Sequence, residues 1–400
     1  MSIETRLTNN SMVRRVNRKK ILSCINNYEK MPRVKICKKT GLSKPTVTRL
    51  IDGLIKEGFL VEKDYIESKK GRHPINIDIN ESAGYCFGIN LSKNTLGAAL
   101  VDLKMNIVEK RLLMINNIVD KDTLVNTVIS VVEDIIKISK IDKNKILGIG
   151  VGAPGLVDYK SGVLKNFALG GKLCGIPLKD LLEKKFGFPV EIDNNCNTRM
   201  LGEHWYGFAV GYDNAMFVIN SEGVGCGLVM DSKIYRKLNN TASGFGHISV
   251  NINGAQCSCG SKGCIETYCS TEAIEKKIKE KLELKYKKTN GEILPDIPAR
   301  SYKKICSGID EGNMEFAYIL IEAACAMACG LVSMINLFRP QVIVLSGNMF
   351  DVSEFYFNMV QSEVSLRLGY SVEMPKIFRR RVKDALYEVG AATMILQKIL

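Results

Sequence analysis

Residues 256–264 read QCSCGSKGC. Three cysteines lie within eight residues in the spacing C-x-C-x4-C, and Gly260 and Gly263 stand among them. A metal site, a disulfide or chance can each produce such a cluster. A closed metal site needs a fourth protein ligand, so the first question is whether the chain supplies one nearby.

The fourth ligand we predict is His247, which is one of only three histidines and stands ten positions before Cys257. With Cys257, Cys259 and Cys264, His247 completes a Cys3His set, the usual composition of a closed structural zinc site. Thiolates at this spacing repel one another without a cation, and the two glycines let the backbone turn tightly. The alternative is a group of free cysteines beside an unrelated histidine.

Length and composition indicate a globular protein of two or three domains. The chain has 400 residues and a mass of 44.4 kDa, with 46% hydrophobic and 24% charged residues. No N-terminal segment combines basic residues with an apolar run, so we expect no signal peptide. The most apolar stretch, Ala323 to Phe338, is too short to span a bilayer and is predicted to be a buried helix. We therefore expect a cytoplasmic protein with no membrane partner, whose 13 cysteines are mostly free thiols.

The positive charge is concentrated in the first fifth of the chain. The formal net charge is +14, and residues 1–80 hold 18 Lys and Arg against 8 Asp and Glu. The other 320 residues hold 38 against 34. This distribution indicates a basic head on a nearly neutral body, which is typical of nucleic-acid binding. The alternative is a solvated basic tail or a small helical domain that binds protein.

The apolar pattern of the head predicts a helix-turn-helix. Apolar residues recur at helical spacing over 13–28, and a short helix fits 33–39 before Gly41. A second helix begins after Ser43, a good N-cap, and Gly58 ends it. Its apolar stripe leaves four polar side chains facing outward near its start, where a recognition helix reads the major groove. These predicted DNA-reading residues are Lys44, Thr46, Thr48 and Arg49.

A wing is predicted after the second helix. Residues 59–62 and 75–79 have strand character, and SKKGRHP (68–74) lies between them. Its Lys69 and Lys70 can neutralise phosphates, and Arg72 beside a glycine can enter a narrow minor groove.

The body reads as an α/β fold. Residues 84–92, 95–103 and 107–115 are predicted as three consecutive strands with short turns. A helix is predicted over 121–139, followed by the apolar strand 146–155. Successive strands, a helix and a further strand indicate a mixed sheet.

Four stretches of the body together resemble the ROK family (repressors, open reading frames and sugar kinases). They are GIGVGAPGLVD (148–158), GFPVEIDNNCNTRMLGE (187–203), GHISVNINGAQCSCGSKGCIE (246–266) and VIVLSGN (342–348). The GRHP wing is similar to the xylose-repressor branch of that family. The resemblance implies an actin/hexokinase-like, ribonuclease-H-like body of two lobes. We predict a winged helix-turn-helix domain over 1–80 and a ROK domain over 81–400, with lobes of approximately 81–193 and 194–400.

Three departures from the kinases of the family argue against phosphotransfer. Asn195 stands where the family has the aspartate that acts as general base, and an amide cannot take that proton. Asp193 lies close by on a predicted strand, where the alternation of side chains is expected to point it to the opposite face. The first phosphate loop, residues 90–94, lacks the aspartate and both glycines, and Glu222 places negative charge in the second loop. We predict no catalytic residue. The alternative is a ROK sugar kinase with a DNA-binding head.

The resemblance also implies a sugar site. Its candidate residues are Asn194, Asn195, His247 and Glu266. The family has a glutamate three positions before this histidine, where the present chain has Gly244. The asparagine that the family usually has in the loop before the sugar-site strand has no counterpart in residues 168–173. These losses leave three possibilities: a small effector such as xylose, glucose or N-acetylglucosamine, a different effector, or a vestigial pocket.

The combined prediction is a homodimeric or homotetrameric repressor of sugar-utilisation genes. Two-fold symmetry requires a palindromic operator in double-stranded DNA, with half-sites about one turn or a multiple of it apart. A sugar effector would change operator affinity by no more than its differential affinity for two states of the protein.

Overall fold

The computed structural model divides the chain into two compact units. It describes residues 13–14, 16–18, 20–26, 30–65, 75–115, 120–166, 173–236, 244–288, 301–369 and 372–399. Unit 1 comprises Met1–Tyr206 and Tyr387–Leu400, and unit 2 comprises Gly207–Leu386.

The head of unit 1 is the predicted winged helix-turn-helix. Residues 13–26 are helical wherever they are described, and a three-stranded sheet of order β1-β3-β2 completes the fold. The elements are β1 (Met31–Pro32), α2 (Arg33–Thr40), α3 (Lys44–Lys56), β2 (Leu60–Tyr65) and β3 (Ile75–Ile79). The two-residue β1 was not predicted, because so short a strand has no readable period.

The turn between α2 and α3 depends on glycine. Gly41 has φ +70° and its N–H donates to the carbonyl of Cys37, which ends α2. Ser43 is the N-cap of α3, as predicted, and Pro45 lies in the first turn of the helix. The inner stripe of α3 is buried and forms the core of the head. It consists of Val47, Leu50, Ile51 and Leu54.

The rest of unit 1 is built on a mixed five-stranded sheet of order β10-β7-β4-β5-β6. The strands are β4 (Tyr85–Leu91), β5 (Thr95–Asp102), β6 (Ile107–Met114), β7 (Ile146–Ala153) and β10 (Val190–Asn194). β7 is parallel to β4 and β10, whereas β5 is antiparallel to both neighbours. The predicted strands and mixed sheet are confirmed.

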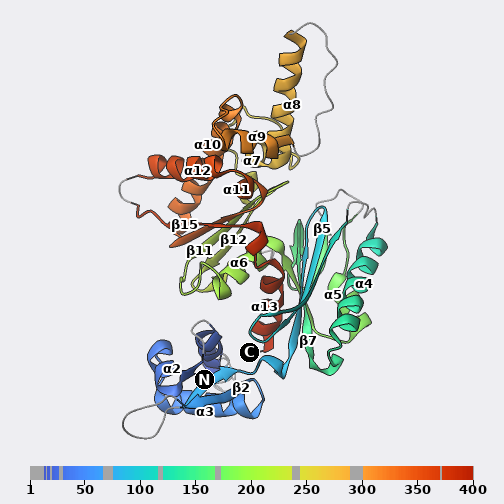
Figure 1. Ribbon diagram of the computed structural model, residues 1–400, viewed down its shortest axis with the longest axis vertical. Coiled ribbons are helices and arrows are strands. Elements are labelled where there is room, and N and C mark those ends of the chain that lie inside the picture. The colour runs from blue at the N-terminus through green and yellow to red at the C-terminus, as the bar shows by residue number, and fades with distance from the viewer. Residues whose placement is uncertain are drawn as a thin grey trace, which may run out of the picture. The chain divides into compact units, whose positions relative to one another are not determined.

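Helices cover both faces of this sheet (Figure 1). α4 (Lys121–Ser139) and α5 (Leu178–Phe186) lie on one face, and α13 (Tyr387–Ile399) packs on the other against α6 (Asn195–Tyr206). The smaller elements of the unit are η1 (Glu81–Ala83), η2 (Lys143–Lys145), β8 (Leu156–Asp158) and β9 (Val163–Asn166). α6 and α13 thus belong to unit 1, whereas the sequence assigned both to the second lobe.

Two glycines allow α13 to approach the sheet closely. A Cβ at Gly88 would lie 1.8 Å from the carbonyl oxygen of Glu388. A Cβ at Gly150 would lie 1.9 Å from that of Ala391. These glycines are therefore required by the contact between α13 and strands β4 and β7.

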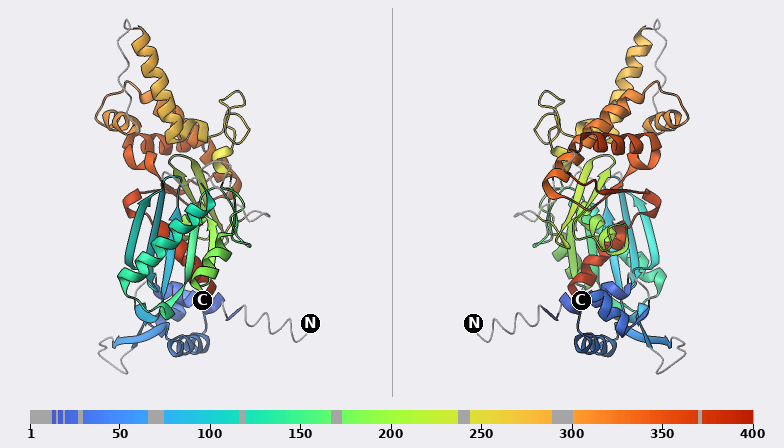
Figure 2. Two further views of the ribbon diagram at one scale, coloured as in Figure 1. Left: turned by 90° about the vertical axis from the view of Figure 1, so that its right-hand side faces the viewer. Right: turned by 90° about the vertical axis from the view of Figure 1, so that its left-hand side faces the viewer.

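Unit 2 contains a second five-stranded sheet, of order β13-β12-β11-β14-β15, with helices packed around it. The strands are β11 (Ala215–Asn220), β12 (Val224–Met230), β13 (Lys233–Ile234), β14 (Val342–Ser346) and β15 (Lys376–Arg380). The helical elements are η3 (Phe245–His247), α7 (Glu266–Cys269), α8 (Thr271–Lys288), α9 (Ser301–Asp310), α10 (Ala317–Phe338), α11 (Asn348–Val352), α12 (Glu354–Arg367) and η4 (Val382–Asp384). α8 projects beyond the other helices of this unit in every view (Figure 2).

The predicted apolar helix is α10, and it is longer than expected. It begins at Ala317 rather than Ala323 and has 22 residues. Among the described residues it is the one helix long and apolar enough to cross a membrane by length and composition, and 61% of its most apolar window is buried inside the structure. It packs in the core of unit 2, with Ala324, Met327 and Leu331 fully buried.

Candidate functional site

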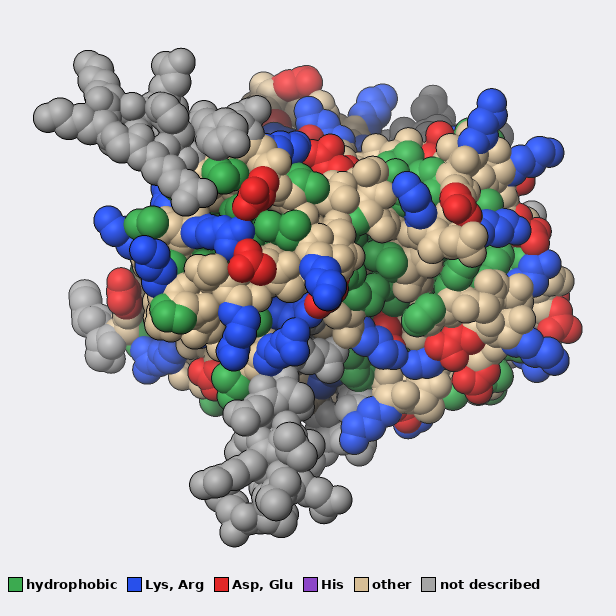
Figure 3. Space-filling model, turned by 90° about the horizontal axis from the view of Figure 1, so that it is seen from below, with side chains coloured by type: hydrophobic (Ala, Val, Ile, Leu, Met, Phe, Trp, Pro, Cys, Tyr) green, Lys and Arg blue, Asp and Glu red, His purple; other side chains and the backbone are tan. Residues whose placement is uncertain are grey.

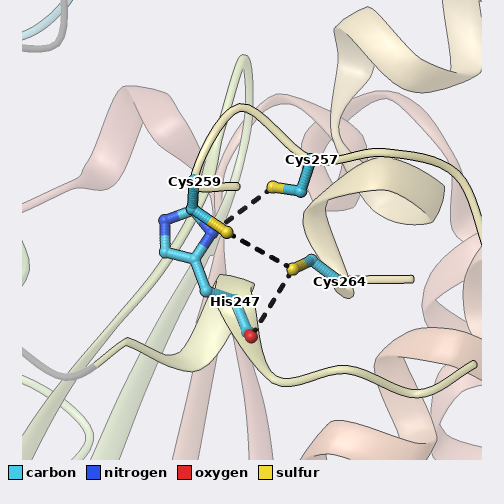
Figure 4. A group of neighbouring side chains, drawn as sticks. All are labelled: His247, Cys257, Cys259 and Cys264. Atoms are coloured by element: carbon cyan, nitrogen blue, oxygen red, sulfur yellow. Dashed lines mark hydrogen bonds between the residues drawn. The ribbon is translucent and has the colours of Figure 1, made fainter. Parts of the chain in front are cut away.

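The side chains of His247, Cys257, Cys259 and Cys264 meet in unit 2 (Figure 4). Their ligand atoms all lie within 4.8 Å of one another. Cys257 Sγ is 3.7 Å from His247 Nδ1, and Cys259 Sγ is 3.7 Å from Cys264 Sγ. The second ring nitrogen of His247 faces away from the three sulfurs (Figure 4).

A tight hairpin brings the three sulfurs together. The N–H of Cys257 donates to the carbonyl of Ser261 at 2.8 Å, and the N–H of Gly260 donates to the carbonyl of Cys257 at 3.0 Å. Gly263 has φ +64°, and a Cβ there would lie 1.7 Å from the carbonyl oxygen of Asn251. The glycines of the opening motif are therefore needed for the turn itself.

The spacing of the Cys259 and Cys264 sulfurs fits tetrahedral zinc. Two sulfurs that are each about 2.3 Å from one zinc ion lie about 3.8 Å apart in tetrahedral geometry. The 3.7 Å between Cys259 and Cys264 matches this value and is far too long for a disulfide, in which the sulfurs are about 2.05 Å apart. Cys269, which the sequence left out of the set, donates instead to the carbonyl of Ala323 at 3.0 Å.

The surroundings of Cys264 disfavour a thiolate in the absence of a cation. Burial, together with the neighbouring sulfurs, raises the pKa of the Cys264 thiol to about 12. Hydrogen bonding to the backbone of Ser261 lowers the pKa of Cys259. A bound cation offsets the cost of holding several thiolates together, which neither the hairpin nor burial does alone.

The predicted DNA-reading residues lie at the start of α3. Lys44 and Arg49 are exposed, and Thr46 and Thr48 are half-buried. The Thr46 hydroxyl is 2.9 Å from the Ser43 hydroxyl. On the face seen in Figure 3, Lys and Arg side chains are interspersed with Asp and Glu side chains. Arg72, the predicted minor-groove residue, lies outside the described residues, as do Lys69 and Lys70.

The two candidate sugar-binding asparagines lie where β10 meets α6 in unit 1. Asn194 donates through Nδ2 to the carbonyl of Gly155 at 3.0 Å and accepts from the N–H of Cys196 at 2.8 Å. Asn195, the first residue of α6, donates to the carbonyl of Leu91 at 3.4 Å. Both asparagines are nearly buried.

Asp193 is not available as a replacement base, for a reason that differs from the sequence argument. The alternation of a strand does not separate it from Asn195, because β10 ends at Asn194. Its Oδ1 accepts from the N–H of Asn194 at 2.7 Å and from Asn197 Nδ2 at 2.9 Å, and the residue is 1% exposed. The carboxylate is thus engaged in holding the start of α6.

A buried arginine occupies the turn that matches the first phosphate loop. Arg199 in α6 is 4% exposed, and its guanidinium lies 3.3 Å from Asn90 Oδ1 and 3.4 Å from Ser92 Oγ. It also stacks 4.1 Å above the centre of the Tyr387 ring. Arg199 was not predicted, because its contact with Asn90 joins positions 109 apart in the sequence and no local pattern indicates it.

Glu222, in the second loop, is contacted by Asn348, the last residue of the VIVLSGN stretch (342–348). Asn348 Nδ2 lies 3.4 Å from Glu222 Oε1, and the Asn348 N–H donates to Ser221 Oγ at 3.0 Å. Glu266, the fourth sugar-binding candidate, accepts from the N–H of Val224 at 2.9 Å through Oε2. Gly244 is exposed. Of 168–173 only Leu173 is described, and it is buried.

Comparison with protein families gives two matches. The ROK family profile matches residues 86–398, and the MarR family profile matches residues 17–64. The first covers most of the body and the second covers most of the head.

The chain is similar over almost its whole length to curated repressors. It is 29% identical to the putative xylose repressor of Caldicellulosiruptor sp. (strain Rt8B.4), over 98% of both chains. It is 29% identical to the xylose repressor of Bacillus subtilis (strain 168), over 92% of both chains. The DNA-binding transcriptional dual regulator NagC of Escherichia coli is 22% identical, over 99% of this chain and 96% of the other.

Solved structures share the fold. A ROK family transcriptional regulator described as a homologue of the Escherichia coli MLC protein superposes with a TM-score of 0.79 and 19% identity, over 96% of this chain and 97% of the other. The ROK hexokinase of Thermus thermophilus superposes with a TM-score of 0.65 and 21% identity, over 79% of this chain and 99% of the other.

Proposed function

The chain belongs to the ROK family, and on this premise we propose that it is a DNA-binding transcriptional repressor of sugar-utilisation genes. The observation that carries the proposal is the helix-turn-helix head, whose α3 exposes Lys44 and Arg49, in one chain with a ROK body. The similarity of the chain to xylose repressors over almost its whole length supports the same function. A regulator of this kind works beside the bacterial chromosome, so we place it in the cytoplasm.

The head, residues 1–80, is proposed to bind duplex DNA. The start of α3 enters the major groove, where Lys44, Thr46, Thr48 and Arg49 meet base edges and phosphates. Arg72 in the wing enters the neighbouring minor groove. Two copies of the chain, as a dimer or within a tetramer, read the two halves of a palindrome.

Selection of bound sequences from a random duplex pool tests this proposal. The full-length protein should enrich a palindrome whose half-sites are about one turn, or a multiple of it, apart. Binding should weaken steeply with added salt, because phosphate contacts release counterions. A pool that is unchanged after several rounds would contradict the proposal.

The Cys3His cluster is proposed to hold one structural zinc ion. Bound zinc supplies charge neutralisation and bracing, and four protein ligands leave no open position for catalysis. The chain's own contribution is the hairpin of residues 256–264 and the orientation of His247. Since Nδ1 of His247 faces the sulfurs, its second ring nitrogen is the one proposed to meet a sugar hydroxyl.

A small sugar is proposed as the effector. Its candidate contacts are Asn194 and Asn195 in unit 1, and His247 and Glu266 in unit 2. The xylose-repressor relatives favour xylose among the candidates, with glucose and N-acetylglucosamine as the others. A ligand that binds only the native state raises the melting temperature, so a thermal-shift panel of sugars and sugar phosphates tests the proposal. The responding sugar should lose its effect with Asn195→Ala. No response to any member of the panel would favour a vestigial pocket.

Phosphotransfer is not proposed. Asn195 replaces the base, Asp193 is engaged, and Glu222 places negative charge in a phosphate loop. The guanidinium of buried Arg199 contacts Asn90 and Ser92 in the other loop. The alternative, a sugar kinase with a DNA-binding head, is tested by measuring ADP release with glucose, xylose and N-acetylglucosamine. Turnover that Asn195→Ala abolishes would establish the kinase.

A further inference from the structure

α6 connects two places in unit 1 that the proposed function uses. It begins at Asn195, directly after Asn194, and both asparagines are candidate contacts of the sugar. It ends at Tyr206, and a helix of its 12 residues is about 18 Å long. Every residue from 195 to 203 is buried, and so is Trp205. The helix is therefore surrounded by protein over most of its length.

The end of α6 that is far from the asparagines packs against the DNA-binding head. Trp205 and Tyr206 line a cavity together with Leu22 and Phe59 of the head and Leu396 of α13. Leu22 belongs to the first helical segment of the head, and Phe59 directly precedes β2 of the wing. Leu22 is 4% exposed and Trp205 is 9% exposed, so both side chains are buried in this contact.

We propose that α6 transmits sugar binding to the head, with Trp205 as the positioning residue at the contact. The inference rests on the proposed function, because it names how a sugar at Asn194 and Asn195 weakens operator binding. A ligand shifts a protein between two arrangements only through its different affinities for them. Since both asparagines lie at the start of α6, the sugar acts directly on this helix, and the head responds at its other end.

α6 and α13 are packed closely enough to move together. A Cβ at Gly390 of α13 would lie 2.1 Å from the carbonyl oxygen of Thr198. Arg199 stacks on Tyr387, the first residue of α13, whereas Leu396 lies near the last turn of α13 beside the head. The two helices thus run parallel from the asparagines to the head. A displacement at the start of α6 reaches the head through a pair of helices rather than through a loop.

The packing at the head end of α6 is incomplete. The cavity lies there, and the buried Tyr206 hydroxyl has no hydrogen-bond partner among the described residues. Thr393 of α13 is near it, but the Thr393 hydroxyl donates to the carbonyl of Val389. A buried polar group without a partner is costly. A second arrangement that gives Tyr206 a partner recovers this cost, and the cavity provides space for the movement.

The contact contains its own reporter, because Trp205 is the only tryptophan of the chain. Indole emission moves to longer wavelength as the ring becomes exposed to water. Xylose, glucose and N-acetylglucosamine are each added to the full-length wild-type protein. The sugar that raises the melting temperature should also shift the emission of Trp205, and the selected operator duplex should shift it in the opposite direction. A sugar that leaves the melting temperature unchanged should leave the emission unchanged.

Substitutions separate the coupling from the two binding events. In the wild type the sugar should weaken operator binding about 5–150-fold. Trp205→Ala should keep the sugar affinity and the sugar-free operator affinity close to their wild-type values, but should lose this fold-change. Trp205→Phe keeps an apolar ring at the contact and should retain most of it.

Leu182→Ala is the matched control for loss of packing. Leu182 is fully buried on α5, which lies on the opposite face of the sheet from α6 and α13. Its truncation should lower the melting temperature and leave the effect of the sugar on operator binding intact. Circular dichroism shows whether each variant is folded, and the wild-type emission decides the question if Trp205→Ala is not.

Two results would overturn the inference and leave the sugar-responsive repressor standing. One is a sugar that weakens operator binding without changing the emission of Trp205. The other is a folded Trp205→Ala protein that keeps the whole effect of the sugar. If no sugar of the panel changes the melting temperature or the operator affinity, the proposed effector fails and the coupling fails with it, whereas operator binding remains.

Discussion

Lys104 Nζ lies 2.9 Å from Asp78 Oδ2, and this ion pair joins the wing to the first sheet of unit 1. Asp78 belongs to β3 of the head, whereas Lys104 lies in the turn between β5 and β6. Lys63 of β2 lies 3.1 Å from the same carboxylate oxygen, and Lys104 also meets Glu81 at 2.8 Å. The side chain of Asp78 is only 5% exposed, so its carboxylate is largely shielded from water, whereas the side chain of Lys104 is 27% exposed.

Replacing Asp78 with asparagine should destabilise unit 1 at neutral pH. Burial disfavours the charged carboxylate, but hydrogen bonds from Lys104 and Lys63 outweigh it, and the pKa of Asp78 is lowered. Its stabilisation is therefore present above the unfolded pKa of about 3.9 and is lost as pH falls through the folded pKa. Asp78→Asn should lower the free energy of unfolding by about 2 kcal/mol at pH 7.

Urea unfolding between pH 7 and pH 3 measures this effect. The difference between wild type and Asp78→Asn should shrink as the medium becomes more acidic. Glu81→Gln is the matched control, because its pair with Lys104 is at the surface and should contribute less than about 1 kcal/mol. A difference that stays constant down to pH 3 would show that the charge of Asp78 does not matter.

Replacing Cys264 with serine should abolish zinc binding. Its thiol is buried and has the Cys259 sulfur 3.7 Å away, so a serine hydroxyl there cannot supply the missing thiolate. Elemental analysis should find about one zinc per wild-type chain and almost none in the variant. The melting temperature should fall in the variant and in chelator-treated wild type alike. Cys174→Ser, which changes an exposed cysteine outside the cluster, should keep both values. Wild-type protein without zinc would contradict the prediction.

Adding one methyl group at Gly150 should weaken the contact between β7 and α13. The Cβ of Gly150→Ala would lie 1.9 Å from the carbonyl oxygen of Ala391, so the helix must move. Overpacking of this kind costs about 1–3 kcal/mol. Gly53→Ala, inside α3, meets no atom within 4 Å and should stabilise by about 0.5–1 kcal/mol. Opposite shifts of the urea midpoint are expected, and stabilisation by both substitutions would refute the role of Gly150.

Local patterns in the sequence predicted the elements well. The helix over 121–139 has the predicted bounds, because Asp120 caps it by accepting from the N–H of Thr123 and its apolar residues are regularly spaced. The cysteine cluster was also predictable, since three of its ligands lie within eight residues.

Long-range packing was not predictable from the same patterns. The spacing of apolar residues over 387–399 does not indicate that α13 packs against β4 and β7. Gly88 and Gly150 allow this contact, but a glycine in a strand does not identify the helix that packs on it. The role of Arg199 depends on its distance to Asn90, which is 109 positions away along the chain. The asparagines 194 and 195 became candidates only through resemblance to a family, because an amide alone indicates no ligand.

Removing Arg49 should weaken operator binding and relax its sequence preference. Arg49 is exposed on the first half of α3, and an arginine there can donate two hydrogen bonds to guanine in the major groove. Arg49→Ala should therefore cost about 1–3 kcal/mol on the selected palindrome and much less on a palindrome changed at the contacted base. Lys44→Ala should weaken binding to both duplexes equally, and the salt dependence of binding should fall by about one counterion.

Lys56→Ala is the matched control for both, because Lys56 is exposed at the opposite end of the same helix. A recognition helix reads the groove with its N-terminal residues, so a change in its last turn should leave affinity and salt slope near the wild-type values. Titrations of each variant against both duplexes, at two salt concentrations, separate loss of base reading from loss of phosphate contact. If Lys56→Ala weakened binding and Arg49→Ala did not, α3 would lie on the DNA in the reverse orientation, and the assignment of its first turn to the major groove would have to be abandoned.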